Sequence, residues 1–214
     1  MAVTAAVFDL DGTLVLTEER NRVVWQRFFD SYGIEVDDAL TAQLTGRRGL
    51  DALREMPHLF PDRDPHELLD EVLAHEVTDD LPEVVPVRGA NELVRRLHAA
   101  RVPLGLVTSA LPEQVATRLL AVDLFDVFDV VVTGRDVTVG KPDPQGFRMA
   151  CERLGVPARN SVGFEDSPAG VAAVKAAGMF CVAVTTTFSR DVLADADLVV
   201  DDLTEVPWPI EEVA

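Results

Sequence analysis

A strand that runs into two carboxylates near the N-terminus constrains this chain more than any other feature. Val3–Val7 is small, apolar or β-branched throughout, which is typical of a strand buried in a parallel sheet. The residues that follow, 8–13, have the sequence FDLDGT. Burying a carboxylate that is neither paired nor metal-bound costs several kcal/mol, so Asp9 and Asp11 are expected at the C-terminal end of the strand, where open α/β sheets bind ligands. Being two residues apart, they project to the same side, and Gly12 lets the chain turn away.

The next part of the chain, from about Leu14 to Pro86, shows helical patterns and no strand-like run. Helices are expected at about 18–32, 38–45, 50–56 and 65–77, the last with Asp64 as its N-cap. Trp25, Phe28 and Phe29 lie on one face of the first helix and are expected to form its core rather than a base-stacking platform. Such a block is too long for an ordinary crossover. We therefore predict a helical cap domain of residues 15–86.

The remainder of the chain alternates strands with helices. Strands are expected at about 103–108, 128–133, 161–164, 179–184 and 198–200, and helices at about 89–100, 112–121, 142–154 and 167–177. This alternation indicates a parallel sheet with right-handed crossovers. The predicted fold is therefore an α/β, Rossmann-like three-layer core, residues 1–14 and 87–214, with the helical cap inserted.

Charge and composition exclude several partners. The formal net charge of −18 disfavours nucleic acid and anionic membrane surfaces, although local cations or a metal could still bind a small anionic substrate. The first ten residues lack the pattern of a secretory signal, and no apolar run is long enough to cross a bilayer. Cys151 and Cys181 are expected to be reduced core residues, with a disulfide as the alternative. We expect a cytoplasmic protein, and its oligomeric state, which is compatible with a monomer, stays open.

Polar residues gather after several of the predicted strands, where a parallel sheet would bring them together. They are Asp9 and Asp11, Thr108 and Ser109, Lys141, and Glu165 and Asp166. This combination suggests phosphoryl transfer. One carboxylate can act as nucleophile and a second as general acid and base. Carboxylates also suit Mg²⁺, while a lysine and hydroxyl groups can bind phosphate oxygens.

The same residues resemble the motifs of the haloacid dehalogenase-like hydrolase superfamily, in its branch with a helical cap. The motif DxDGT matches residues 9–13, and the hydroxyl motif matches Thr108 with Ser109. The lysine motif matches Lys141 within residues 140–142, and the acidic motif matches residues 165–167. Four motifs in the right order, over nearly the whole chain, make the resemblance specific.

The resemblance implies a role for each matched residue. Asp9 would be the nucleophile, and Asp11 the general acid and base. Mg²⁺ would be bound by Asp9, the backbone carbonyl of Asp11, Asp166, and Glu165 either directly or through water. The phosphate would be held by Thr108, Ser109 and Lys141. The helical cap would close over the substrate and exclude water.

The resemblance also narrows the reaction. Asp11 indicates phosphate rather than carbon–halogen cleavage, because haloacid dehalogenases need no acid/base at that position. We expect a Mg²⁺-dependent phosphatase acting on a sugar phosphate or phosphoglycolate. The alternative is a β-phosphoglucomutase-like mutase, which Asn21 disfavours because the mutase-like pattern has a histidine there. A phospho-receiver signalling domain combines similar residues but needs no cap.

Residues of the cap are candidates for substrate selection. Arg47 and Arg48 follow Gly46, where the resemblance places specificity residues, and Glu18 and Asn21 lie in the first cap helix. A solvated helix face is the competing interpretation of all four. The core motifs have structural alternatives too: turn or helix-cap roles for the aspartates, Thr108 and Glu165, and a surface position for Lys141.

Overall fold

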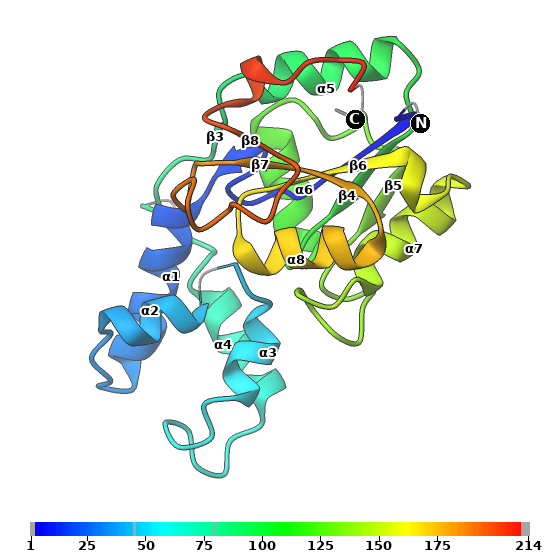
Figure 1. Cartoon of the computed structure of the whole chain (residues 1–214). Helices are drawn as coiled ribbons and strands as arrows, with labels where there is room; N and C mark the ends of the chain where they lie inside the picture. Colours follow the sequence, from blue (N-terminus) through cyan, green and yellow to red (C-terminus); the bar gives the residue numbers. More distant parts are fainter. Residues whose placement is uncertain (1–2, 45, 79, 211–214) are drawn as a thin grey trace. The chain divides into compact units, whose positions relative to one another are not determined.

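The computed structural model describes residues 3–44, 46–78 and 80–210 (Figure 1). The chain divides into two compact units. The first comprises Met1–Leu16 and Val84–Ala214, here called the core unit, and the second comprises Thr17–Glu83, here called the helical unit.

The core unit is built on a parallel sheet of six strands in the order β5-β4-β1-β6-β7-β8. The central strand β1 lies between β4 and β6, with Phe8 opposite Leu106 and Phe164. Asp9 therefore follows the middle of the sheet. The strands are β1 (Ala5–Phe8), β4 (Leu104–Val107), β5 (Val130–Val132), β6 (Ser161–Glu165), β7 (Phe180–Val184) and β8 (Leu198–Val200).

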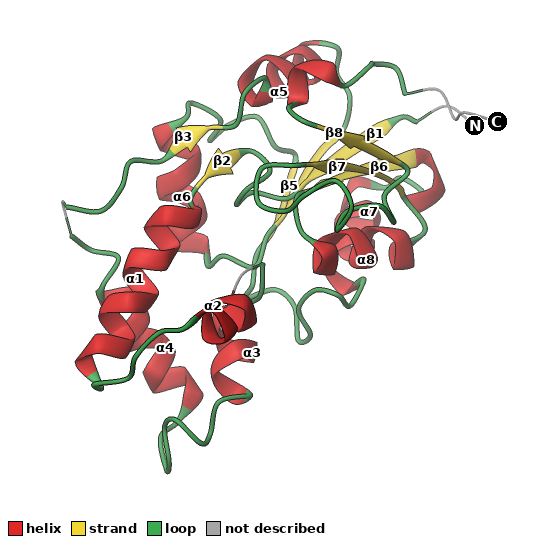
Figure 2. Cartoon of the chain, turned by 60° about the vertical axis from the view of Figure 1, so that its left-hand side comes forward, coloured by secondary structure: helices red, strands yellow, loops and turns green. Residues whose placement is uncertain are grey.

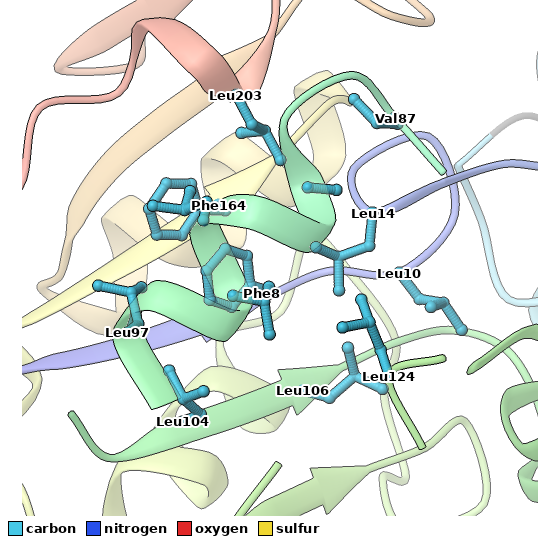
Figure 3. Close-up of a cluster of buried hydrophobic side chains, with 14 of the residues drawn as sticks. Phe8, Leu10, Leu14, Val87, Leu97, Leu104, Leu106, Leu124, Phe164 and Leu203 are labelled. Carbon is cyan, nitrogen blue, oxygen red and sulfur yellow. The ribbon is translucent and has the colours of Figure 1, made fainter. Parts of the chain in front are cut away.

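Helices cover both faces of this sheet (Figure 2). Buried residues of α5 (Ala90–Ala99) and α6 (Pro112–Ala121) pack with Phe8 in one apolar cluster, part of which is drawn in Figure 3. Val7, the neighbour of Phe8 on β1, faces the other cluster with α7 (Gln145–Leu154) and α8 (Pro168–Ala177). This alternation is the two-residue period of a strand buried on both faces. The predicted three-layer α/β fold is confirmed.

Two short strands were not expected from the sequence. β2 (Val15–Leu16) and β3 (Val85–Pro86) pair antiparallel, so the expectation of no strand between about Leu14 and Pro86 is wrong at both ends of that stretch. Two residues are too few to show an alternating pattern. This ladder belongs to the core unit, and the division between the units accordingly falls after Leu16 and before Val84.

The helical unit has a hydrophobic core of its own. It contains α1 (Glu18–Ser31), α2 (Asp38–Leu44), α3 (Gly49–Arg54) and α4 (Pro65–Ala74). Phe28, Phe29 and Phe60 are buried at its centre with their rings in mutual contact. Asp64 caps α4 as predicted, accepting a hydrogen bond from the His66 amide at 2.8 Å. Phe28 and Phe29 thus have the core role expected from their spacing.

Three smaller features complete the description. The single-turn helices η1 (Ala158–Asn160) and η2 (Leu203–Glu205) lie in the core unit. Cys151 and Cys181 are buried there as free thiols. Across the described ranges, every helix falls short of the length and hydropathy required to cross a membrane.

Candidate active site

The end of β1 brings three charged side chains into contact. The Asp9 amide donates to the Phe164 carbonyl at 2.9 Å, so pairing with β6 continues up to this residue. The ammonium of Lys141, which lies in the loop between β5 and α7, donates to Asp9 Oδ1 at 2.5 Å and also to Glu165 Oε1. All three side chains are buried, Asp9 being only 5% exposed. A surface position for Lys141 is therefore excluded.

Burial and charge shift the ionisation of this group. Burial raises the pKa of Asp9 to about 8, and the carboxylates of Glu165 and Asp11 act in the same direction, while Lys141 opposes them. Burial alone would lower the pKa of Lys141, but Asp9 and Glu165 outweigh it and raise that pKa. Lys141 is thus a permanent cation at the strand end.

Asp9, Glu165 and Asp166 form a cluster that suits a metal ion. One carboxylate oxygen from each lies within 4.8 Å of the others. Glu165 is fixed by its second oxygen, which accepts hydrogen bonds from the Asp166 amide and from the amide and hydroxyl of Ser167. The start of α8 also packs closely against the Glu165 carboxylate, since a Cβ on Gly170 would lie 1.8 Å from the Glu165 carboxyl carbon. The cluster is therefore held in place by its own backbone.

The donor set fits a hard divalent cation. Asp11 adds a fourth carboxylate to the three of the cluster; Lys141 contacts Asp9 and Glu165, and Arg118 contacts Asp11. Hard oxygen donors with excess negative charge are the ligands preferred by Mg²⁺. The turn after β1 is also tight. Gly12 has φ +81°, and a Cβ there would lie 1.9 Å from Asp166 Oδ2. These observations favour a metal over a purely structural role for the acids.

Asp11 has a cation of its own that the sequence analysis missed. Arg118 Nη1 donates to Asp11 Oδ2 at 2.6 Å. Arg118 is 4% exposed and lies on the inward face of α6, with Val115 and Leu119. An arginine at an inward position of an amphipathic helix was the available signal, since buried cations are nearly always paired.

The hydroxyl motif follows β4, the strand next to β1. Thr108 is buried, and its hydroxyl accepts a hydrogen bond from the Ala110 amide at 3.0 Å. The structural alternative, that Thr108 caps α6, does not hold, because α6 begins after Leu111, whose amide donates to Gln114 Oε1 at 2.7 Å. Ser109 is half-buried beside Thr108.

A threonine run after β7 also reaches the first motif. Thr186 Oγ1 donates to the Gly12 carbonyl. Thr187 Oγ1 is buried close by, since a Cβ on Gly12 would lie 2.7 Å from it. The sequence analysis did not single out these residues, although three threonines directly after a buried strand are a visible signal.

The four cap candidates belong to the helical unit. Arg47 pairs with Glu55 at 2.6 Å at the surface. Arg48 precedes α3, pairs with Asp51 at 2.7 Å and is only 6% exposed, so a solvated helix face does not describe it. Glu18 and Asn21 lie in the first turn of α1. The acidic cluster at the end of β1 belongs to the core unit instead.

The sequence matches known proteins over most of its length. A family model described as haloacid dehalogenase-like hydrolase matches residues 3–178. A protein of Streptomyces hygroscopicus subsp. limoneus named validoxylamine A 7'-phosphate phosphatase is 43% identical over 95% of this chain and 96% of its own. A Thermotoga maritima protein named phosphorylated carbohydrates phosphatase is 34% identical over 82% of each chain.

Solved structures show the same architecture. The crystal structure of β-phosphoglucomutase from Clostridium difficile matches with a TM-score of 0.83, covering 96% of this chain and 94% of its own. At 23% identity, this likeness is evidence for the fold alone.

Proposed function

The chain belongs to the haloacid dehalogenase-like hydrolases and is a phosphatase of that family, and from this we propose that it hydrolyses a small phosphorylated sugar through a phosphoryl group carried on Asp9. The substrate class rests on the relatives, whose names specify phosphates of a sugar-like compound and of carbohydrates. The single observation that supports the mechanism is the placement of Asp9, buried at the centre of the sheet and bonded to Lys141.

In the first step, an oxygen of Asp9 attacks phosphorus while the bond to the leaving alcohol breaks. Asp11 donates a proton to the departing oxygen, which leaves as the neutral alcohol. Lys141 offsets the charge of carboxylate and phosphate as they approach, and the hydroxyls of Thr108 and Ser109 donate to phosphate oxygens.

In the second step, water attacks the phosphorus of the phosphorylated Asp9. Asp11, now a carboxylate, takes the proton from that water, and the bond between phosphorus and Asp9 breaks. Inorganic phosphate is released, the Asp9 side chain is regenerated, and Asp11 holds the proton that it donates in the next cycle. Splitting the reaction this way lets one residue act first as acid and then as base.

Mg²⁺ would be held by Asp9, Glu165, Asp166 and the backbone carbonyl of Asp11. When bound, it supplies positive charge that offsets the phosphate and the carboxylates. The three buried carboxylates, with one oxygen of each within 4.8 Å of the others, support this assignment.

The experiment is release of inorganic phosphate from a panel of sugar phosphates, with phosphoglycolate and 4-nitrophenyl phosphate included. We expect Asp9→Asn to abolish turnover and Asp11→Asn to lower kcat by about 10²–10⁴-fold. Asp126→Asn, at an exposed position, is the matched control and should behave as the unmodified protein. An active Asp9→Asn variant would refute the role of Asp9.

The same assay addresses the alternatives. A receiver domain would release no more than one phosphate per chain. A mutase, given β-glucose 1-phosphate and a trace of the bisphosphate, would yield glucose 6-phosphate rather than free phosphate. We expect many turnovers to free phosphate.

A further inference from the structure

We propose that Arg118 is a positioning residue for Asp11, holding its carboxylate by Oδ2 in the orientation from which Asp11 transfers protons. This inference rests on the proposed function, because it assigns Arg118 to a step of that reaction. The contact is the 2.6 Å hydrogen bond from Arg118 Nη1, and it joins residues 107 positions apart in the sequence.

The position of Arg118 is costly unless its charge is used. On α6 the inward residues are Val115, Arg118 and Leu119, the spacing of an apolar helix face. A guanidinium does not lose its proton in proteins, so burial here requires a lasting partner. Leucine or methionine at this position would fill the same face without that cost. The arginine is thus explained by its partner rather than by packing.

Both ends of the contact are attached to rigid elements. Asp11 lies just after β1, between Leu10 and Leu14, which are both fully buried (Figure 3). The apolar cluster that contains them also includes Val115 and Leu119 of α6. This packing fixes the distance between α6 and the turn after β1, which contains Asp11. A hydrogen bond across such a frame holds a side chain in one orientation, which is what proton transfer requires.

Each reacting carboxylate therefore has a separate cation. Lys141 contacts Asp9 and Glu165, whereas Arg118 contacts Asp11. The Asp11 side chain keeps 19% of its surface exposed although its partner keeps 5%. The guanidinium thus holds Asp11 from the interior side, and part of the Asp11 side chain stays accessible to solvent.

The test separates proton transfer from general damage by varying the leaving group. Unactivated phenyl phosphate needs a proton on its leaving oxygen, whereas 4-nitrophenyl phosphate releases a stable anion without one. For Arg118→Met we expect kcat/KM to fall by about 30-fold or more with phenyl phosphate and by less than about threefold with 4-nitrophenyl phosphate. With 4-nitrophenyl phosphate, kcat should still fall, and a burst of nitrophenolate should appear, because hydrolysis of the phosphorylated enzyme also uses Asp11.

Three further variants complete the design. Arg135→Met removes an exposed arginine that pairs at 3.1 Å with Glu113, a residue of α6. This variant should leave kcat/KM unchanged with both phenyl phosphate and 4-nitrophenyl phosphate. Arg118→Lys should show the same trend more weakly, and it provides the comparison if the methionine variant does not fold. In an Asp11→Asn background, Arg118→Met should produce no further loss in kcat/KM with phenyl phosphate.

Two outcomes would overturn the inference. One is an equal loss with both esters in Arg118→Met or Arg118→Lys, which a structural role would produce. The other is a full additional loss in the Asp11→Asn background. Failure of the proposed function is distinguishable, since the unmodified protein would then release no phosphate or Asp9→Asn would stay active.

Discussion

The core unit and the helical unit bury their charged pairs to different depths. In the core unit, buried contacts join residues far apart in sequence, as Lys141 does with Asp9 across 132 positions. In the helical unit, Arg48 pairs with Asp51 three positions away, and Arg27 pairs with Asp80 across 53 positions, but with 71% of the Asp80 side chain exposed. Long-range pairs need the sheet to form before they meet, whereas local pairs form with their own helix.

The pKa values of Asp9 in the core unit and of Glu71 in the helical unit shift in opposite directions. Burial raises the pKa of Asp9 to about 8, which means that the folded core disfavours this charge. In the helical unit, the pKa of Glu71 is lowered, first by a hydrogen bond from Tyr32 and then by one from Arg63. Folding disfavours the ionised form of Asp9, which is typical of active-site groups, whereas it favours the ionised form of Glu71, which therefore stabilises the fold.

The largest effect that tests this comparison is expected from the acidic cluster. Chelation with EDTA should abolish phosphate release, and added Mg²⁺ should restore it. Asp166→Asn should raise the Mg²⁺ concentration for half-maximal activity by about 10²-fold, because it removes one of three buried carboxylates whose oxygens lie within 4.8 Å of each other. The measurement is initial rate against Mg²⁺ concentration.

The control for this experiment is an acidic residue of the helical unit that pairs with an arginine. Asp51→Asn removes a carboxylate that pairs locally with Arg48 in the helical unit, and it should leave the Mg²⁺ dependence unchanged. Full activity in EDTA would contradict a metal site at the acidic cluster. So would an equal increase, in both variants, of the Mg²⁺ concentration for half-maximal activity.

The same contrast explains what the sequence could and could not predict. The strand ends were predictable, because runs such as Ala5–Phe8 are buried on both faces and their polar residues must follow them. Arg118 was not predicted, because its partner lies 107 residues away and its spacing alone resembles any amphipathic helix. The pairing of β2 with β3 was missed because each has two residues. Long-range partners are the information that local patterns lack.

An intermediate effect is expected from Arg48, where the two kinds of charge overlap. It is buried like the core charges but paired locally, and the family resemblance places specificity residues there. If Arg48 contacts the substrate, Arg48→Met should raise KM for the sugar phosphate hydrolysed fastest by about tenfold, with kcat changing less than threefold. Steady-state kinetics measures both constants.

Arg27→Met is the matched control, because Arg27 pairs with an exposed Asp80 in the same unit and is not a candidate for substrate contact, and it should change neither constant. A lower melting temperature for Arg48→Met with an unchanged KM would place Arg48 among the structural charges of the helical unit. That result would make the contrast between the units complete.

The smallest effect is expected from the pH dependence of the contacts around Glu71. Tyr32 donates to Glu71 Oε2 at 2.5 Å and Arg63 donates to Glu71 Oε1, which ties the end of α1 to α4. Since these contacts lower the pKa of Glu71 below its usual 4.5, the stability they contribute is fully present above that pH and is lost as the pH falls through the lowered value. We expect Glu71→Gln to lower the melting temperature by about 1–3 °C at pH 7, and the difference to shrink at about pH 3.5.

Asp70→Asn, an exposed neighbour on α4, is the control and should show no such pH-dependent difference. Because the Glu71 carboxylate is partly exposed, solvent screens the interaction, and a loss much larger than a few degrees would contradict the assignment to hydrogen bonding at the surface. A difference that persists unchanged at low pH would mean that Glu71 acts through packing against Tyr32, with no contribution from its charge. The opposite sign, a variant that gains stability at pH 7, would place Glu71 with Asp9 as a charge held at a cost, and would break the comparison between the two units.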